Sequence, residues 1–340
     1  MYMTWTFDFD SKEAIDSTGH RFKYKEKSIE SVDEEVKFLM NSGCLTSHFL
    51  CVRTYLFHNG RGLIVYTSNG GTLDGESYSL FQQDEHGLFH FSKSCKKYIW
   101  KIICFILHMN KRKSVHRKIS LKLDCIHLDG PDHVLVGEVD ELDPRMMEHT
   151  YVDDFSYFLD DLKDRFINAH HSVVFHEEVL DFVATASSIL NEMRAMPNYS
   201  IFHVHPAIWL TKKVRTFILE FDIFLTYDND ANTIIDKVDE SFLMLNCGEY
   251  KDWQMKVDAE ILVEHTNTDS GDPESYPPTF KGFVKCICNC YFNFPHYQPF
   301  KHKENVHVYF QKIWPNYVLG LWKMLTLMQC KEKVLNRLIE

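Results

Sequence analysis

The chain has 340 residues, 45% apolar and 25% charged, a composition typical of soluble globular proteins and sufficient for two domains. A formal net charge of −11 excludes a generally basic nucleic-acid-binding protein, and the acids among the first residues predict no secretory signal. The 10 cysteines follow no regular spacing, so we expect free thiols and an intracellular, cytoplasmic protein.

The first forty residues contain clear local signals. Residues 1–18 predict an aromatic edge strand and a polar connection, and residues 20–27 alternate as a second strand with Phe22 and Tyr24 on one face. Residues 31–43 predict a helix, because a serine–glutamate capping box opens the segment, apolar residues recur at helical spacing and a glycine follows it.

The apolar run over residues 49–67 is interrupted by Asn59-Gly60-Arg61-Gly62. Apolar residues before the interruption recur at helical spacing, and Leu63 to Tyr66 form a continuous apolar strand after it. Asn-Gly pairs permit positive φ angles and mark sharp reversals of the chain. We therefore expect a helix, a tight turn and a buried strand, with Gly75 closing the unit.

This order resembles the divergent AlbA-like unit of the Schlafen family, in which a helix ends in an Asn followed by paired glycines, an apolar strand and a further glycine. The resemblance covers residues 16–145. It implies an α+β fold of mixed or antiparallel sheets flanked by helices, with a Schlafen-like lobe over residues 1–145. It also implies RNA processing. Related nematode Schlafen-like proteins assemble into a multi-subunit nuclease that trims piRNA precursors, so this chain is expected to be such a subunit, catalytic or not, with RNA and other Schlafen-like subunits as partners and no small-molecule cofactor.

The family's acidic signature, E-S-x-x-x-E-x-K, fits residues 30–37. In this register the resemblance makes Glu30, Glu35 and Lys37 catalytic in a metal-dependent endoribonuclease. Hard cations prefer carboxylate ligands, and a lysine stabilises charge on a phosphorane. The third acid of the family falls on Ser68 or Asn69, so Asp74 is the nearest substitute, and Glu30, Glu35 and Asp74 would bind Mn²⁺ or Mg²⁺.

A second register fits the same signature in a degenerate form over residues 16–23, D-S-x-x-x-R-F-K. Arg21 then replaces the second acid, which removes the metal site. This register places the signature's strand where alternation predicts one and leaves residues 31–43 as the following helix. Both registers stay open on the sequence, and so does the choice between a catalytic and a non-catalytic chain.

Ten of the 37 basic residues lie between Lys93 and Lys122, a stretch that contains no acid. Residues 95–109 within it predict a helix with an apolar body. Because each neutralised phosphate releases counterions, such a stretch predicts contact with an RNA backbone. The expected RNA-binding residues are Lys96, Lys97, Lys101, Lys111, Arg112, Lys113, Arg117 and Lys118. The alternative is a non-enzymatic interaction scaffold, in which the same stretch docks an acidic surface.

The remaining segments complete the predicted organisation. Residues 77–91 predict a hairpin that turns at Asp84-Glu85-His86-Gly87, and residues 116–126 and 133–138 predict strands. Residues 146–200 are expected as a helical linker between the lobes, with a helix before residue 168 and another over residues 177–196.

Residues 201–340 are predicted as a second, β-rich lobe with a C-terminal helix. The expected strands cover residues 214–227, 256–265 and 283–294. Cys286, Cys288 and Cys290 would alternate on the last of these, and we interpret them as buried thiols, so zinc is not expected there. The apolar stretch over residues 313–330 is too interrupted for a bilayer span and predicts a docking helix, with membrane attachment the alternative.

Overall fold

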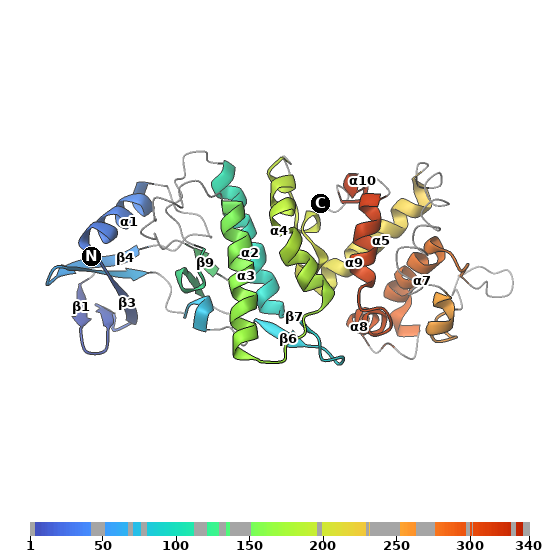
Figure 1. The fold of residues 1–340 in the computed structure, drawn as a ribbon, viewed down its shortest axis with the longest axis horizontal. Coiled ribbons are helices and arrows are strands. Elements are labelled where there is room, and N and C mark those ends of the chain that lie inside the picture. The colour runs from blue at the N-terminus through green and yellow to red at the C-terminus, as the bar shows by residue number, and fades with distance from the viewer. Residues whose placement is uncertain are drawn as a thin grey trace. The chain divides into compact units, whose positions relative to one another are not determined.

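The computed structural model describes residues 4–41, 52–66, 71–75, 80–111, 121–128, 134–136, 151–195, 199–228, 231, 252–262, 276–296, 300, 302–327 and 331–335. The chain divides into two compact units, unit 1 over residues 1–195 and unit 2 over residues 196–340 (Figure 1). The predicted α+β class is confirmed, since antiparallel sheets and helices both occur.

Unit 1 begins with a five-stranded antiparallel sheet of order β1-β2-β3-β5-β4. Its strands are β1 (Trp5–Asp8), β2 (Glu13–Asp16), β3 (Arg21–Lys27), β4 (Val52–His58) and β5 (Arg61–Tyr66). The sheet curls, because the ring of Phe9 after β1 stacks on the ring of His58 at the end of β4, with centroids 4.4 Å apart. The predicted edge strand and the strand predicted over residues 20–27 are confirmed as β1 and β3, but the polar connection expected between them contains strand β2.

The helix predicted before Asn59 is wrong, because residues 52–58 form strand β4. Asn59 has φ 49° and Gly60 has φ 75°, and two successive positive φ angles form the type I′ turn that joins antiparallel strands. Tyr55 and Phe57 are exposed, whereas the residues between and before them are half-buried. The period of burial is therefore two, and the unit compared with the Schlafen pattern is a hairpin.

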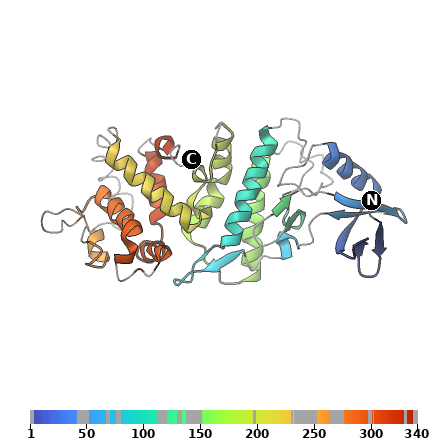
Figure 2. The ribbon, with the colours of Figure 1, turned by 180° about the vertical axis from the view of Figure 1, so that it is seen from behind.

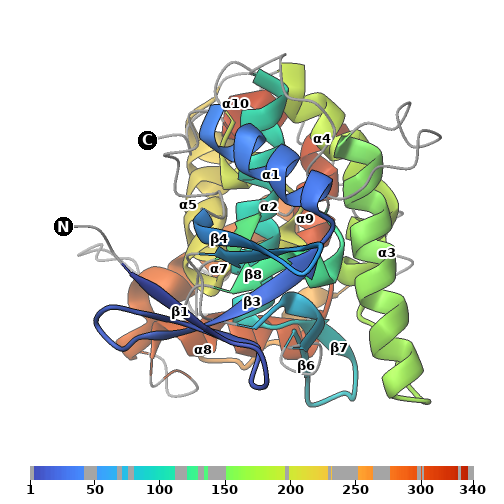
Figure 3. The same cartoon turned by 90° about the vertical axis from the view of Figure 1, so that its left-hand side faces the viewer.

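Helix α1 (Ile29–Asn41) lies across one face of this sheet (Figure 3). Val32 and Val36 of the helix pack on Ile64 and Tyr66 of β5, and a separate cluster around Phe22 fills the opposite face. The predicted helix is confirmed. It begins two residues earlier than the sequence predicts, after a serine at position 28 whose Oγ accepts a hydrogen bond from the backbone of residue 31.

In the described residues, the rest of unit 1 forms short β-hairpins and long helices (Figure 2). The elements are β6 (Phe81–Gln83), β7 (Phe89–Phe91), α2 (Lys93–Lys111), η2 (Leu123–Cys125), β8 (Ile126–Leu128), β9 (Val134–Val136), α3 (Tyr151–Ala169) and α4 (Glu177–Ala195). Helix α4 packs against α3, α2 and β7. The predicted hairpin and all three helices are confirmed. Of the strand predicted over residues 116–126, residues 116–120 lie outside the described ranges, and the visible part is a 3₁₀ turn that leads into β8.

The regular secondary structure in the described residues of unit 2 is helical, so the predicted β-rich lobe is wrong for these residues. Its elements are η4 (Ile201–His203), η5 (Pro206–Ile208), α5 (Thr211–Tyr227), η6 (Trp253–Lys256), α7 (Phe280–Asn293), η7 (Phe294–His296), α8 (Lys303–Ile313), α9 (Tyr317–Leu327) and α10 (Lys331–Leu335). Residues 257–262 form bends and turns in place of the strand predicted over residues 256–265, of which residues 263–265 lie outside the described ranges. Phe217, Phe221 and Phe224 are fully buried at helical spacing on α5, because tertiary packing outweighs the strand preference of aromatic residues.

Helix α7 corrects the interpretation of the cysteines as one face of a strand. Cys286, Cys288 and Cys290 are all buried on a helix whose other positions are also largely buried. The predicted C-terminal helix is confirmed as α9. Within the described ranges, none of the helices combines the length and the apolar character needed to cross a bilayer.

Candidate functional site

The structure places the two glutamates of the acidic signature on different sides of α1. Glu30 is exposed in the first turn, whereas Glu35 is completely buried. The Glu35 carboxylate accepts hydrogen bonds from Lys27 Nζ and from the Tyr66 hydroxyl, each at 2.7 Å. Residues five positions apart on a helix point about 140° from each other. Glu35 therefore serves the packing of α1 on the sheet.

The other residues of the predicted catalytic site also have structural partners. Lys37 is exposed and pairs with Asp33 one turn away. Asp74 is exposed and forms an ion pair with Arg165 of α3. Among the side chains that the structure describes, the predicted metal-binding acids do not form one group of potential ligands.

The second register of the signature agrees with the observed elements. β3 begins at Arg21, and α1 follows it. Asp16, the first residue of this register, is the last residue of β2, and its carboxylate accepts hydrogen bonds from the backbone and hydroxyl of Thr18 and from the backbone of His20. Its role in the described structure is to hold the connection between β2 and β3.

The basic stretch divides between α2 and residues that the structure does not describe. Lys97 and Lys101 are half-buried on α2, one turn apart, and Lys93 is exposed one turn before them. Lys96 is half-buried on the same helix and interacts electrostatically with Glu178 of α4. The side chain of Lys111 and all of Arg112, Lys113, Arg117 and Lys118 lie outside the described residues.

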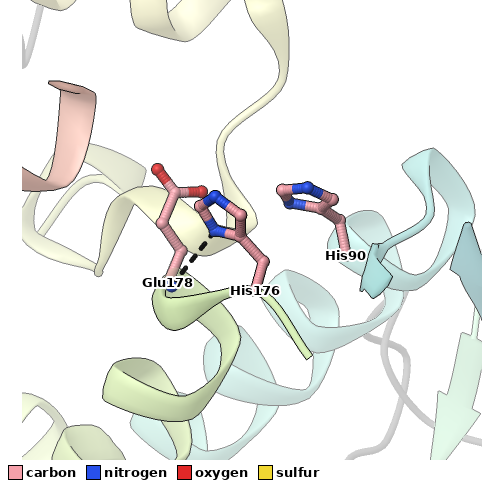
Figure 4. A group of neighbouring side chains, drawn as sticks. All are labelled: His90, His176 and Glu178. Carbon is pink, nitrogen blue, oxygen red and sulfur yellow. Dashed lines mark hydrogen bonds between the residues drawn. The ribbon is translucent and has the colours of Figure 1, made fainter. Parts of the chain in front are cut away.

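A group that the sequence did not predict lies where the β6–β7 hairpin meets the start of α4. Phe89 N donates to Val174 O at 2.9 Å, and His176 N donates to Phe89 O at 3.0 Å. This parallel bridge places His90 beside His176. Their imidazole rings stack with centroids 4.1 Å apart and planes inclined by 30° (Figure 4).

The phenylalanines that precede these histidines in the chain belong to an aromatic cluster, which fixes the junction between the hairpin and the start of α4. The ring of Phe81 lies 4.4 Å from that of Phe166 and 5.2 Å from that of Phe175, and Phe89 lies 5.1 Å from Phe166. Because neighbouring residues of an extended chain point to opposite sides, the phenylalanines direct His90 and His176 away from this cluster. A large aromatic contact therefore determines the position of the histidines.

Glu178, in the first turn of α4, completes the group (Figure 4). One potential ligand atom from each of His90, His176 and Glu178 lies within 4.8 Å of the others, and this is the one such group that the described part of the chain contains. All three side chains are buried, with His176 only 1% exposed. His176 Nδ1 accepts a long hydrogen bond, 3.3 Å, from Glu178 N, and its buried Nε2 has no hydrogen-bond partner.

Two further charged residues adjoin this group. Asp84, at the hairpin turn, has its Oδ2 2.9 Å from His90 Nε2, while its Oδ1 accepts from the backbones of His86 and Leu88. Lys96 of α2 interacts electrostatically with Glu178. We call His90, His176 and Glu178, with Asp84 and Lys96 beside them, the histidine cluster.

Burial dominates the protonation of the histidine cluster. It lowers the pKa of His176 to about 4 and lowers that of His90, where the bond to Asp84 opposes the shift. Burial raises the pKa of Glu178 to about 7, although the attraction of Lys96 opposes this shift. Burial also lowers the pKa of Lys96. Both imidazoles are therefore neutral near pH 7, which is the form that binds metal ions.

Sequence reasoning missed this group because its members are far apart in the chain. Asp84 was predicted only as a turn residue, and His90, His176 and Glu178 were not singled out. The available signal was a Phe-His pair at positions 89–90 repeated at 175–176, just before an acidic first helical turn. Such pairs carry no metal-ligand spacing, and only the backbone bridge brings them together.

No protein-family model matches this chain, and no curated protein matches its sequence. The Schlafen-like resemblance and the role in RNA processing therefore stay predictions.

Proposed function

We propose that this protein is an RNA-binding, non-catalytic subunit of a Schlafen-like endoribonuclease that acts on precursor RNA. The observation that carries the proposal is a row of lysines along one side of α2. Lys93, Lys97 and Lys101 follow one another there at intervals of four residues, and the helix contains no acidic residue.

Lysines at this spacing lie on one side of a helix, about 6 Å apart along its axis. A row of like charges on one helix face is unfavourable by itself and favours an anionic partner. Each phosphate neutralised by such a row releases counterions, which supplies affinity without base specificity. The basic residues that follow α2 in the sequence extend the same charge.

The burial of Glu35 supports a non-catalytic role for this chain. Its carboxylate is buried and accepts two short hydrogen bonds, so it has no route to a solvent-exposed phosphodiester. A partner subunit would then supply the carboxylates that bind the catalytic metal ion. This division of labour also fits the second register of the signature, in which this chain lacks the second acid.

The test is RNA binding by the full chain, measured by fluorescence anisotropy with a labelled single-stranded RNA. Replacing Lys93, Lys97 and Lys101 by alanine should weaken binding and make the dependence of log K on log salt shallower by about 2, since each lost contact with single-stranded RNA changes the slope by roughly 0.7. A matched control replaces the exposed Lys12, Lys23 and Lys212 and should leave the slope unchanged.

A cleavage assay with Mn²⁺ on the same RNA tests the second half of the proposal, and the chain alone should release no product. Cleavage that Glu35→Gln abolishes would overturn the non-catalytic assignment. Absence of RNA binding at low salt, or equal effects of the two triple variants, would overturn the RNA-binding assignment and favour the interaction scaffold.

A further inference from the structure

The histidine cluster has no part in the proposed RNA binding, and its geometry points to a ligand. We propose that His90, His176 and Glu178 bind one divalent first-row transition-metal ion of the zinc class, which joins the β6–β7 hairpin to the start of α4. Two imidazole nitrogens and one carboxylate oxygen are a donor set for borderline metal ions, whereas Mg²⁺ and Ca²⁺ favour oxygen ligands.

The first support is the unpartnered nitrogen of His176. Buried polar groups in folded proteins are nearly always hydrogen-bonded, and an unpaired one costs about 1–3 kcal/mol. His176 Nε2 is buried without a partner, and one ring nitrogen of His176 lies within 4.8 Å of ligand atoms of His90 and Glu178. A metal ion at this position would bind the unpartnered nitrogen and would also compensate the charge of the buried carboxylate.

The second support is the orientation of His90 by Asp84. A histidine that binds a metal ion commonly donates its other ring N–H to a carboxylate, which fixes the tautomer and the direction of the ring. The 2.9 Å contact between His90 Nε2 and Asp84 Oδ2 provides this arrangement and leaves His90 Nδ1 for the ion. Asp84 is itself held by two backbone N–H groups of its turn.

Binding requires a small movement of the side chains. Ligand atoms of a tetrahedral zinc ion lie about 3.4 Å apart, so atoms spread over as much as 4.8 Å must draw together, and the stacked rings must open. The ring of His176 can turn, because the hydrogen bond that its Nδ1 accepts from Glu178 N is long. Lys96 attracts the Glu178 carboxylate in the same place, so it competes with the ion.

The test uses the full chain, stripped with a chelator and titrated with Zn²⁺ by calorimetry, and with Co²⁺ by visible absorption because zinc is spectroscopically silent. We expect one ion per chain and a higher unfolding temperature with zinc. His176→Gln and Glu178→Gln should each weaken binding at least tenfold, and Asp84→Asn, which removes no ligand, by 10- to 100-fold. Lys96→Met should tighten binding, an effect that a purely structural role of the cluster would not produce.

The matched control is His127→Gln, which alters another buried histidine of unit 1 outside the cluster. It should leave zinc affinity unchanged. If a ligand variant fails to fold, as judged by circular dichroism without metal, Asp84→Asn and Lys96→Met still decide the question. Absence of stoichiometric binding would overturn the proposal, and so would equal affinity of wild type, Glu178→Gln and Lys96→Met, which would place the ion elsewhere.

Discussion

Replacing Glu35 by alanine should strongly destabilise unit 1, because Glu35 is a buried member of an ion pair. Its carboxylate is completely buried, and the Lys27 side chain that donates to it is only 15% exposed. Removing one partner of a buried pair costs about 3–5 kcal/mol, since the remaining charge stays dehydrated. The Tyr66 hydroxyl loses its acceptor in the same step.

The measurement is hydrogen exchange of peptides from β3, α1 and β5, which reports on unit 1 alone in a chain of two units. In Glu35→Ala, exchange of the slowest amides should accelerate by roughly two to four orders of magnitude, the factor that corresponds to about 3–5 kcal/mol. Removing both charges, in Lys27→Met with Glu35→Leu, should restore most of the protection. As a control, Lys37→Ala breaks an exposed pair on the same helix and should cost less than about 1 kcal/mol. Acceleration below tenfold in Glu35→Ala, or a double variant worse than the single one, would refute the reasoning.

Three further predictions follow from local geometry. Gly62→Ala should destabilise the packing of α1 by about 1–3 kcal/mol in urea unfolding, because a Cβ there would lie 2.5 Å from Val32 Cγ2. The control is Gly71→Ala, which should be nearly neutral because a Cβ at this position would have nothing within 4 Å. Equal effects of the two substitutions would contradict the prediction. Hydrogen bonds lower the pKa of Asp16 to about 2 from 3.8, so its contribution to stability is present above pH 3.8 and is lost as the pH falls toward 2. Asp16→Asn should therefore flatten the dependence of the unfolding midpoint on pH in this range. An unchanged dependence in the variant would disprove the prediction. Thr279→Ala should cost about 1 kcal/mol, because the threonine side chain caps α7, whereas Thr279→Ser should retain most of that stability.

Local signals in the sequence determined much of unit 1. The helices α1, α2, α3 and α4 follow from apolar spacing that repeats over several turns, and the β6–β7 turn follows from the Asp84 side chain, which accepts backbone hydrogen bonds across the reversal. These features depend on interactions within a few residues of each other, so a single sequence carries them.

Local reasoning failed where short apolar segments fit two periods. The residues before Asn59 fit a helix by spacing, but Asn59 and Gly60 both have positive φ angles, which commits the flanking segments to an antiparallel hairpin. On α5 and α7, aromatic and β-branched residues suggested strands, but tertiary packing decided otherwise. Helix α5 buries one face, with Phe217 against Trp322, and α7 is largely buried, with Phe283 against Trp314.

The candidate sites show the same division more sharply. The sequence alone established that Glu35 is acidic and that α2 is basic, but the tertiary structure paired Glu35 with Lys27 and brought His90, His176 and Glu178 together across the Phe89 bridge. The physical reason is that burial and pairing are properties of atoms in space. A carboxylate in water and the same carboxylate under a helix differ in hydration and in partners, and neither difference is encoded in the neighbouring residues.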